Sequence, residues 1–176
     1  MRTSIALIGF MGTGKTVVGQ ALARKLGKDF IELDAIIEKK AGKSIPGIFR
    51  EDGEIRFREL EIEATNETAA KKDAVIACGG GIVLNTINIF RLKQECVIVC
   101  LTASTELIVK RTSGDKDGRP LLAVADKEKQ IKELLEYRRP FYERAAEITI
   151  DTSNISVSDV VQKILEALSN YESHDK

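Results

Sequence analysis

The residues with the clearest chemistry lie between positions 9 and 16, where the letters GFMGTGKT fit the pattern G-x-x-x-x-G-K-T. An apolar run precedes them and a helical pattern begins at Lys15. Glycines let successive backbone N–H groups surround an anion, and a helix N-terminus adds the positive end of its dipole. Lys15 can reach the outer phosphates of a nucleotide, and the Thr16 hydroxyl can ligate Mg²⁺. The alternative is a glycine-rich turn with a chance lysine, but the coincidence of motif, strand and helix favours a nucleoside triphosphate site.

The rest of the chain narrows the class of protein that uses this loop. The guanine-reading motif N-K-x-D of a switch GTPase does not occur, and 176 residues are too few for a motor or an AAA-type ATPase. A small-molecule or nucleotide kinase fits the size. The only histidine is His174, in a polar terminal segment, so a Ser/His/Asp or Cys/His apparatus has no imidazole. We therefore expect a general base to be a carboxylate or a lysine.

Two carboxylates follow the second apolar run. Asp34 closes the strand predicted at 30–33, and the carboxyl ends of parallel strands are where such sheets bind ligands. The alternative role of Asp34 is the N-cap of the next helix. Glu32 lies two residues earlier on the same strand face. One carboxylate could hold Mg²⁺ through water while the other accepts a proton from a substrate.

Arg138 stands inside the apolar stripe of a helix predicted from about Asp126. An unpaired buried guanidinium is very unfavourable, so an anion should face it. That anion is either a carboxylate of the protein or the carboxylate of a bound ligand. Pro140 should kink this helix. The stripe consists of Ile131, Leu134, Leu135, Phe141 and Tyr142.

Three further features have both a structural and a functional interpretation. Arg58 and Glu61, three residues apart on a helix, could form a surface ion pair that contributes little. The glycines at 79–81 follow an apolar strand, so either another group approaches their backbone closely or the turn needs positive φ. Arg119 lies in the glycine- and charge-rich segment 113–125, which we expect to be a mobile loop that closes over phosphates.

The composition excludes several other classes of function. Lys and Arg total 27 and Asp and Glu total 27, and this balance argues against a protein that coats nucleic acid or an anionic membrane. No apolar run approaches the length of a membrane span, and no signal-peptide pattern is present, so we expect an intracellular, cytoplasmic protein. Cys78, Cys96 and Cys100 lack C-x₂-C spacing, which favours buried structural thiols over a zinc site. Nothing in the sequence requires more than a monomer.

Apolar runs alternate with helical patterns along the whole chain. Runs that are apolar throughout and alternate with helices indicate a parallel sheet that is covered on both faces. A chain of this length is expected to form one domain, residues 1–176. Helical spacing is clearest at 15–26, 57–64 and 157–168, with Gly27 as a stop and Gly53 as an interruption. The predicted strands are 5–8, 30–33, 74–78, 96–101 and 147–150.

Taken together, these landmarks resemble those of the shikimate kinase family over nearly the whole chain. The loop at 9–16 is common to many nucleotide-binding proteins, whereas the ordered combination of the other landmarks is specific to this family. Those landmarks are LDAIIE at 33–38, GKSI at 42–45, FREDGE at 49–54, FRELE at 57–61, GGG at 79–81, RPLL at 119–122 and RRPFY at 138–142.

The resemblance implies an α/β, three-layer P-loop kinase fold with a five-stranded parallel sheet of order 2-3-1-4-5. It also implies a shikimate-binding region at about 34–65 and a mobile lid at 113–125; the polar end of the chain, about 170–176, should be a flexible tail that tolerates truncation. The reaction would be transfer of the γ-phosphate of ATP to the 3-hydroxyl of shikimate, with Mg²⁺, in the route to chorismate and the aromatic amino acids.

The same resemblance assigns roles to individual residues. Asp34 would hold the shikimate hydroxyls and act as the base. Arg58 and Arg138 would bind the shikimate carboxylate, and the backbone of Gly80 and Gly81 would contact the ring hydroxyls.

On the nucleotide side, Lys15 and Arg119 would stabilise charge on the transferred phosphoryl group, and Arg111 would stack on adenine. Thr16 would ligate the metal and Glu32 would reach it through water. The family commonly has aspartate where this chain has Glu32, so we expect a change in metal geometry. The loop residues on the nucleotide would be Gly12, Thr13, Gly14, Lys15, Thr16 and Val17.

Two other readings of the same residues compete with an active shikimate kinase. One is a related small-molecule kinase, such as a gluconate kinase, which has less need for two arginines that converge on a carboxylate. The other is a non-catalytic, nucleotide-responsive module that binds a partner through residues 113–125. The presence of Asp34, Arg58 and Arg138 together argues against such a module, because it needs none of them.

Overall fold

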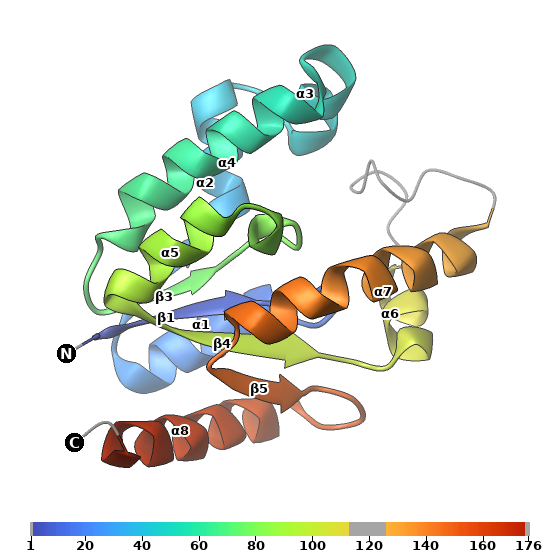
Figure 1. The fold of residues 1–176 in the computed structure, drawn as a ribbon. Helices are drawn as coiled ribbons and strands as arrows, with labels where there is room; N and C mark the ends of the chain where they lie inside the picture. Colours follow the sequence, from blue (N-terminus) through green and yellow to red (C-terminus); the bar gives the residue numbers. More distant parts are fainter. Residues whose placement is uncertain (1, 113–125, 175–176) are drawn as a thin grey trace.

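The computed structural model describes residues 2–112 and 126–174. The loop predicted at 113–125, with Arg119, and residues 175–176 of the predicted tail lie outside the described residues. Figure 1 shows the fold as a sheet between two layers of helices.

Five parallel strands form one sheet in the order β2-β3-β1-β4-β5, as expected. Parallel pairing places the carboxyl ends of all strands at one edge of the sheet, with Ile8 of β1 opposite Cys100 of β4. The strands are β1 (Ser4–Ile8), β2 (Asp29–Glu32), β3 (Ala74–Ala77), β4 (Cys96–Thr102) and β5 (Ile148–Asp151).

The helices cover both faces of the sheet. Alternate residues of β1 enter different clusters, because successive side chains of a strand point to opposite faces. Ile5 and Leu7 join a cluster with α1 and α8, whereas Ala6 and Ile8 join the larger cluster with the remaining major helices. The helices are α1 (Lys15–Leu26), α2 (Leu33–Ala41), α3 (Ile45–Glu51), α4 (Gly53–Ala69), the short 3₁₀ helix η1 (Ile82–Leu84), α5 (Thr86–Glu95), α6 (Thr105–Thr112), α7 (Lys127–Ala145) and α8 (Val157–His174).

The placement of Asp34 differs from the sequence-based expectation. Strand β2 ends at Glu32, so Leu33 begins α2 and Asp34 lies in the first turn of that helix instead of closing the strand. The N-cap of α2 is Glu32, which makes the N-cap role considered for Asp34 wrong. Helix α7 continues through Pro140 to Ala145.

The three cysteines are buried and free, as predicted. Cys96 and Cys100 lie in the same cluster because they occupy one face of β4. Within the two described stretches of chain, no helix is both long and apolar enough to cross a membrane.

Candidate active site

A cavity of about 340 Å³ opens at the carboxyl edge of the sheet, where the loops after β1, β2 and β3 meet. It brings together most of the residues that the sequence singled out. Its lining consists of Met11, Gly12, Gly14, Lys15, Thr16, Val17, Glu32, Asp34, Cys78, Gly79, Gly80 and Arg111.

The loop between β1 and α1 has the backbone of an anion cradle. Gly9, Gly12 and Gly14 have φ values of +144°, +79° and +93°, which residues with a Cβ rarely adopt. The Lys15 ammonium group donates hydrogen bonds to the carbonyls of Gly9, at 2.9 Å, and Phe10, at 3.0 Å. Burial lowers the pKa of Lys15, and the carboxylate of Asp34 opposes that shift. The lysine therefore lies inside the loop, beside the space where phosphates would bind.

Glu32 and Asp34 supply negative charge next to this lysine. Burial raises the pKa of Glu32, while a hydrogen bond from Thr16 lowers it, and the Oε2 atom of Glu32 is buried without a hydrogen-bond partner. Burial also raises the pKa of Asp34, with the charge of Lys15 acting against it. Its Oδ1 atom is likewise buried and unpartnered. Oxygen atoms in this condition are suited to receive a metal-bound water or a substrate hydroxyl.

The residues present fit a magnesium ion held together with a nucleotide. Mg²⁺ in such sites keeps several waters and takes few protein ligands. Here the Thr16 hydroxyl acts on the pKa of Glu32, and the Oε2 atom of that residue is buried and unpartnered. Among the described residues, no group of three or more His, Cys, Asp or Glu side chains could hold a metal without a nucleotide.

Each glycine at 79–81 lies against a different charged side chain. A Cβ on Gly79 would come 2.8 Å from Asp34 Oδ1, and a Cβ on Gly81 would come 2.5 Å from Arg58 Nη1. A Cβ on Gly80 would lie 3.6 Å from Arg138 Nη1. None of the three has positive φ. Close approach, the first of the two explanations considered, therefore accounts for this triplet.

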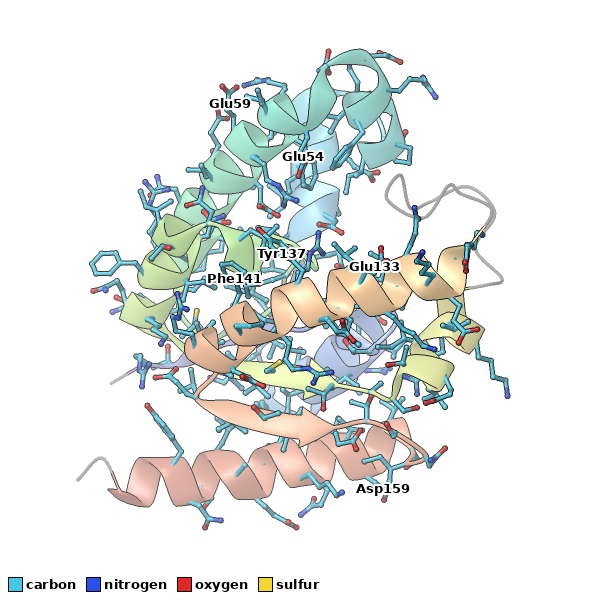
Figure 2. All side chains as sticks on the ribbon, turned by 45° about the vertical axis from the view of Figure 1, so that its right-hand side comes forward. Glu54, Glu59, Glu133, Tyr137, Phe141 and Asp159 are labelled. Atoms are coloured by element: carbon cyan, nitrogen blue, oxygen red, sulfur yellow. The ribbon has the colours of Figure 1, made fainter. Side chains whose placement is uncertain are left out.

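Arg58 approaches the glycines from α4 and is fixed by two carboxylates of its own helix. Its Nη1 donates to Glu61 Oε1 at 3.0 Å, and its Nη2 donates to Glu54 at 3.1 Å. Figure 2 labels Glu54 on α4. Glu61 is only 1% exposed, so the surface ion pair that the spacing suggested is wrong. The stripe of Phe57 and Leu60 that packs on the sheet carries Glu61 inward with it.

Arg138 is buried, as the stripe on α7 predicts, with 3% exposure. Its guanidinium carbon lies 5.9 Å from the centre of the Phe10 ring. Its Nε has no hydrogen-bond partner, and no described carboxylate forms an ion pair with it. Of the two anions considered, a protein carboxylate does not form an ion pair with Arg138 in the described part of the chain, although the charge of Arg138 opposes the burial that raises the pKa of Glu61. A hydrogen-bond acceptor on a ligand would satisfy the N–H groups of Arg138 that lack a partner.

Tyr142 belongs to the same cluster and was missed as a functional candidate. Its hydroxyl donates a hydrogen bond to the carbonyl of Gly80. The signal was present in the sequence, since Tyr142 stands four residues after Arg138 on the same helix face.

Arg111 borders a second cavity of about 210 Å³, which adjoins the phosphate loop. Its Nη1 donates to the carbonyl of Gly12 at 3.0 Å and reaches Thr152 Oγ1 at 3.5 Å. Val17 and Val157 line the same cavity and are 53% and 40% exposed. A cation beside exposed apolar side chains is suited to a flat aromatic ring.

Comparison with known proteins gives a consistent result. The profile of the family described as shikimate kinase matches residues 11–169. A shikimate kinase of Caldanaerobacter subterraneus subsp. tengcongensis is 48% identical over 164 residues, covering 93% of this chain and 95% of that protein. Another, from Thermodesulfovibrio yellowstonii, is 48% identical over 170 residues, covering 95% and 97%.

Solved structures agree with the sequence relatives. The shikimate kinase from Acinetobacter baumannii in complex with shikimate superposes with a TM-score of 0.91 at 43% identity, covering 96% of this chain and 94% of that one. A gluconokinase from Sinorhizobium meliloti reaches a TM-score of 0.62 at 18% identity, which shows a shared fold alone. The chain therefore belongs to the shikimate kinase family.

Proposed function

We propose that this chain carries out the reaction of its family with the residues gathered at the carboxyl edge of the sheet. The γ-phosphoryl group of ATP passes to the 3-hydroxyl of shikimate, giving shikimate 3-phosphate and ADP. The observation that carries the proposal is the convergence of one buried unpartnered carboxylate, two arginines and a glycine backbone beside the phosphate loop.

The nucleotide binds across the two adjoining cavities. The backbone of residues 12–17 surrounds its phosphates, and Lys15 turns from the carbonyls of its own loop towards the β- and γ-phosphates. Arg111 covers the adenine, with Val17 on the apolar side of the same cavity. Each of these contacts uses a group that already borders empty space.

Shikimate binds on the other side of the phosphate loop. Its carboxylate is received by Arg58 and Arg138, whose guanidinium groups border Gly81 and Gly80. Its ring hydroxyls meet the backbone of these glycines and the carboxylate of Asp34. Arg138 is buried and has no ion pair with a described carboxylate, and a guanidinium in that condition is costly, which makes a carboxylate-bearing acceptor the best match.

Asp34 acts as the base towards the 3-hydroxyl. Burial raises the pKa of Asp34, which strengthens the ionised carboxylate as a proton acceptor. Lys15 balances the charge that develops on the phosphoryl oxygens, and positioning does most of the remaining work. Arg119, outside the described residues, is proposed to add a second positive charge there.

Thr16 and Glu32 are the residues that would hold Mg²⁺, the first by its hydroxyl and the second through water. When bound with ATP, the ion neutralises phosphate charge. The Thr16 hydroxyl opposes the burial that raises the pKa of Glu32, which is in keeping with two neighbouring groups at this position. A cytoplasmic, monomeric protein completes the proposal, and the three free buried thiols are in keeping with a reducing compartment.

The test is to identify the product made from ATP and three acceptors: shikimate, gluconate and water. Phosphorus NMR of the mixture should show a phosphomonoester on the 3-position of shikimate. Rapid phosphorylation of gluconate instead would favour the related small-molecule kinase. ATP binding without any phosphorylated product would favour the nucleotide-responsive module.

A further inference from the structure

Tyr142 lies where two parts of the shikimate site meet. It is buried on α7, one helical turn after Arg138, and its hydroxyl donates to the carbonyl of Gly80, 62 positions away in the sequence. Burial raises the pKa of this phenol, and the charge of the nearby Arg138 guanidinium opposes that shift. A phenol can donate once and accept as well, so after donating to Gly80 this oxygen can still accept from the guanidinium of Arg138.

The groups joined in this way come from different elements. Gly80 belongs to the loop after β3, and Arg138 belongs to α7, which also packs against η1. A Cβ on Gly80 would meet Met11 N at 3.5 Å and Arg138 Nη1 at 3.6 Å, so this glycine is packed between the phosphate loop and the arginine. The Tyr142 hydroxyl is the hydrogen-bonded connection between α7 and this loop.

Arg138 needs such a connection because packing restrains its side chain, whereas no hydrogen bond or ion pair with another described residue directs its guanidinium. Its Nε has no partner, and its long side chain has many rotamers to lose on binding a ligand. The guanidinium also contacts the Phe10 ring, but a contact with a ring face does not fix where its N–H groups point. Tyr142 supplies a directional contact.

We propose that Tyr142 is a positioning residue for the acceptor, which sets the spacing between the guanidinium of Arg138 and the backbone of Gly80. The inference rests on the proposed function, in which these two groups receive the carboxylate and a ring hydroxyl of shikimate. A fixed spacing selects acceptors that carry a carboxylate at the right distance from their hydroxyls. Tyr142 therefore acts on specificity as well as on affinity.

A purely structural role makes a different prediction. If the hydroxyl only satisfies a buried carbonyl, its removal lowers stability and leaves the preference among acceptors unchanged. If the hydroxyl positions Arg138, its removal weakens shikimate binding and reduces the preference of the enzyme for an acceptor with a carboxylate over one without. The preference for a carboxylate is thus the measurement that separates the two roles.

The experiment compares Tyr142→Phe with Tyr137→Phe. Tyr137 is on the same helix, is 62% exposed and makes a tilted ring contact with Phe141, with both residues labelled in Figure 2. Steady-state kinetics give KM and kcat for shikimate and KM for ATP. Calorimetric titration of each protein with shikimate and with its carboxamide analogue gives the preference for the carboxylate.

For Tyr142→Phe we expect a KM for shikimate about tenfold higher, as for the loss of a hydrogen bond near a charged group. The KM for ATP should stay within about twofold, and the preference for shikimate over its carboxamide should fall by a similar factor of about ten. Tyr137→Phe should match the wild type in all of these. In an Arg138→Ala background, adding Tyr142→Phe should change shikimate binding by less than about threefold, since the group it orients is gone.

Three results would overturn the inference. One is a Tyr142→Phe enzyme with unchanged KM for shikimate. Another is a raised KM with an unchanged preference for the carboxylate. The third is a variant that fails to fold, since a hydroxyl with a local role is not essential to the whole domain. Failure of the wild type to phosphorylate shikimate would instead contradict the proposed function, so the two failures are distinguishable.

Discussion

Replacing Gly81 by alanine should damage shikimate binding without damaging the fold. An ideal Cβ at this position lies 2.5 Å from Arg58 Nη1 and 2.7 Å from Nη2. Ordinary van der Waals contact begins at 3.4 Å, so the guanidinium must move by about 0.9 Å. The obstacle is the end of a flexible side chain, and Gly81 does not have positive φ, so the backbone can stay in place.

The displacement removes Arg58 from its position between Glu61 and the site. Loss of one charge-assisted hydrogen bond to a carboxylate costs about 1.5–3 kcal/mol, or roughly a 10- to 150-fold rise in the KM for shikimate. The KM for ATP should not change, and the midpoint of thermal unfolding should fall by less than about 4 °C. Steady-state kinetics with each substrate varied in turn will measure these effects.

A matched control is Gly47→Ala in α3, where the nearest atom to a new Cβ is Ser44 Oγ at 3.3 Å and the site is not touched. It should leave both KM values unchanged. An unaltered KM for shikimate in Gly81→Ala would refute the assignment of Arg58 to the carboxylate. So would an equal rise in the KM for ATP, because it would show general disruption of the site.

Three other predictions concern single residues. Asp34→Asn should lower kcat by about 10²–10⁴-fold, because a general base is lost. Burial raises the pKa of Asp34, so the kcat/KM of the wild type should fall as pH drops through that pKa. Thermal unfolding should show the Asn variant more stable by about 1 kcal/mol, or roughly 2–4 °C, because it no longer buries this charge. A less stable Asn variant would contradict the view that burial of the Asp34 charge destabilises the folded protein. Arg111→Ala should raise the KM for ATP about 2- to 30-fold and leave that for shikimate unchanged, and equal effects on both substrates would count against adenine stacking. Glu147→Gln should lower the free energy of urea unfolding by about 1–3 kcal/mol near neutral pH. The reason is that the pKa of Glu147 is lowered in the folded protein: burial alone would raise it, but hydrogen bonds from Ile98 N, Arg2 and Tyr171 outweigh that effect. This stabilisation is present above the unfolded pKa of Glu147 and is lost as pH falls through its lowered folded pKa. The difference from wild type should therefore shrink as pH falls through that range, and a difference that does not depend on pH would exclude ionisation as its source.

The sheet was predictable because its three central strands, β3, β1 and β4, are almost wholly apolar and buried. Each of the five strands was located to within about two residues, the usual uncertainty of element boundaries. The position of Arg138 was predictable for a related reason, since a charge inside a helical apolar stripe must face the interior.

Helix α5 was not predicted, because its pattern is inverted. Asn88 is fully buried in this helix, while Phe90 and Ile87 are 65% and 43% exposed. A polar residue in an inward position and apolar ones in outward positions cancel the periodic signal on which such predictions depend. Helix α6 was also not predicted; it has only eight residues, with Ile108 and Thr112 facing inward.

The contacts within the site could not be predicted without the fold. Asp34 and Gly79, and Arg58 and Gly81, are separated by many positions, and the α/β crossovers alone bring them together. Glu61 was misjudged because the spacing of a charged pair does not say which face of the helix it occupies. The apolar neighbours Phe57 and Leu60 carry that information, and they place Glu61 inside.

The central claim is that the buried guanidinium of Arg138 binds the carboxylate of the acceptor. The most direct test is ADP release from MgATP with and without shikimate, for the wild type, for Arg138→Ala and for Arg139→Ala, whose side chain is exposed on the same helix. We predict strong dependence on shikimate, a KM for shikimate raised about 10- to 150-fold in Arg138→Ala, and no change in Arg139→Ala. An Arg138→Ala enzyme that keeps the wild-type KM, or a wild type indifferent to shikimate, would contradict the claim.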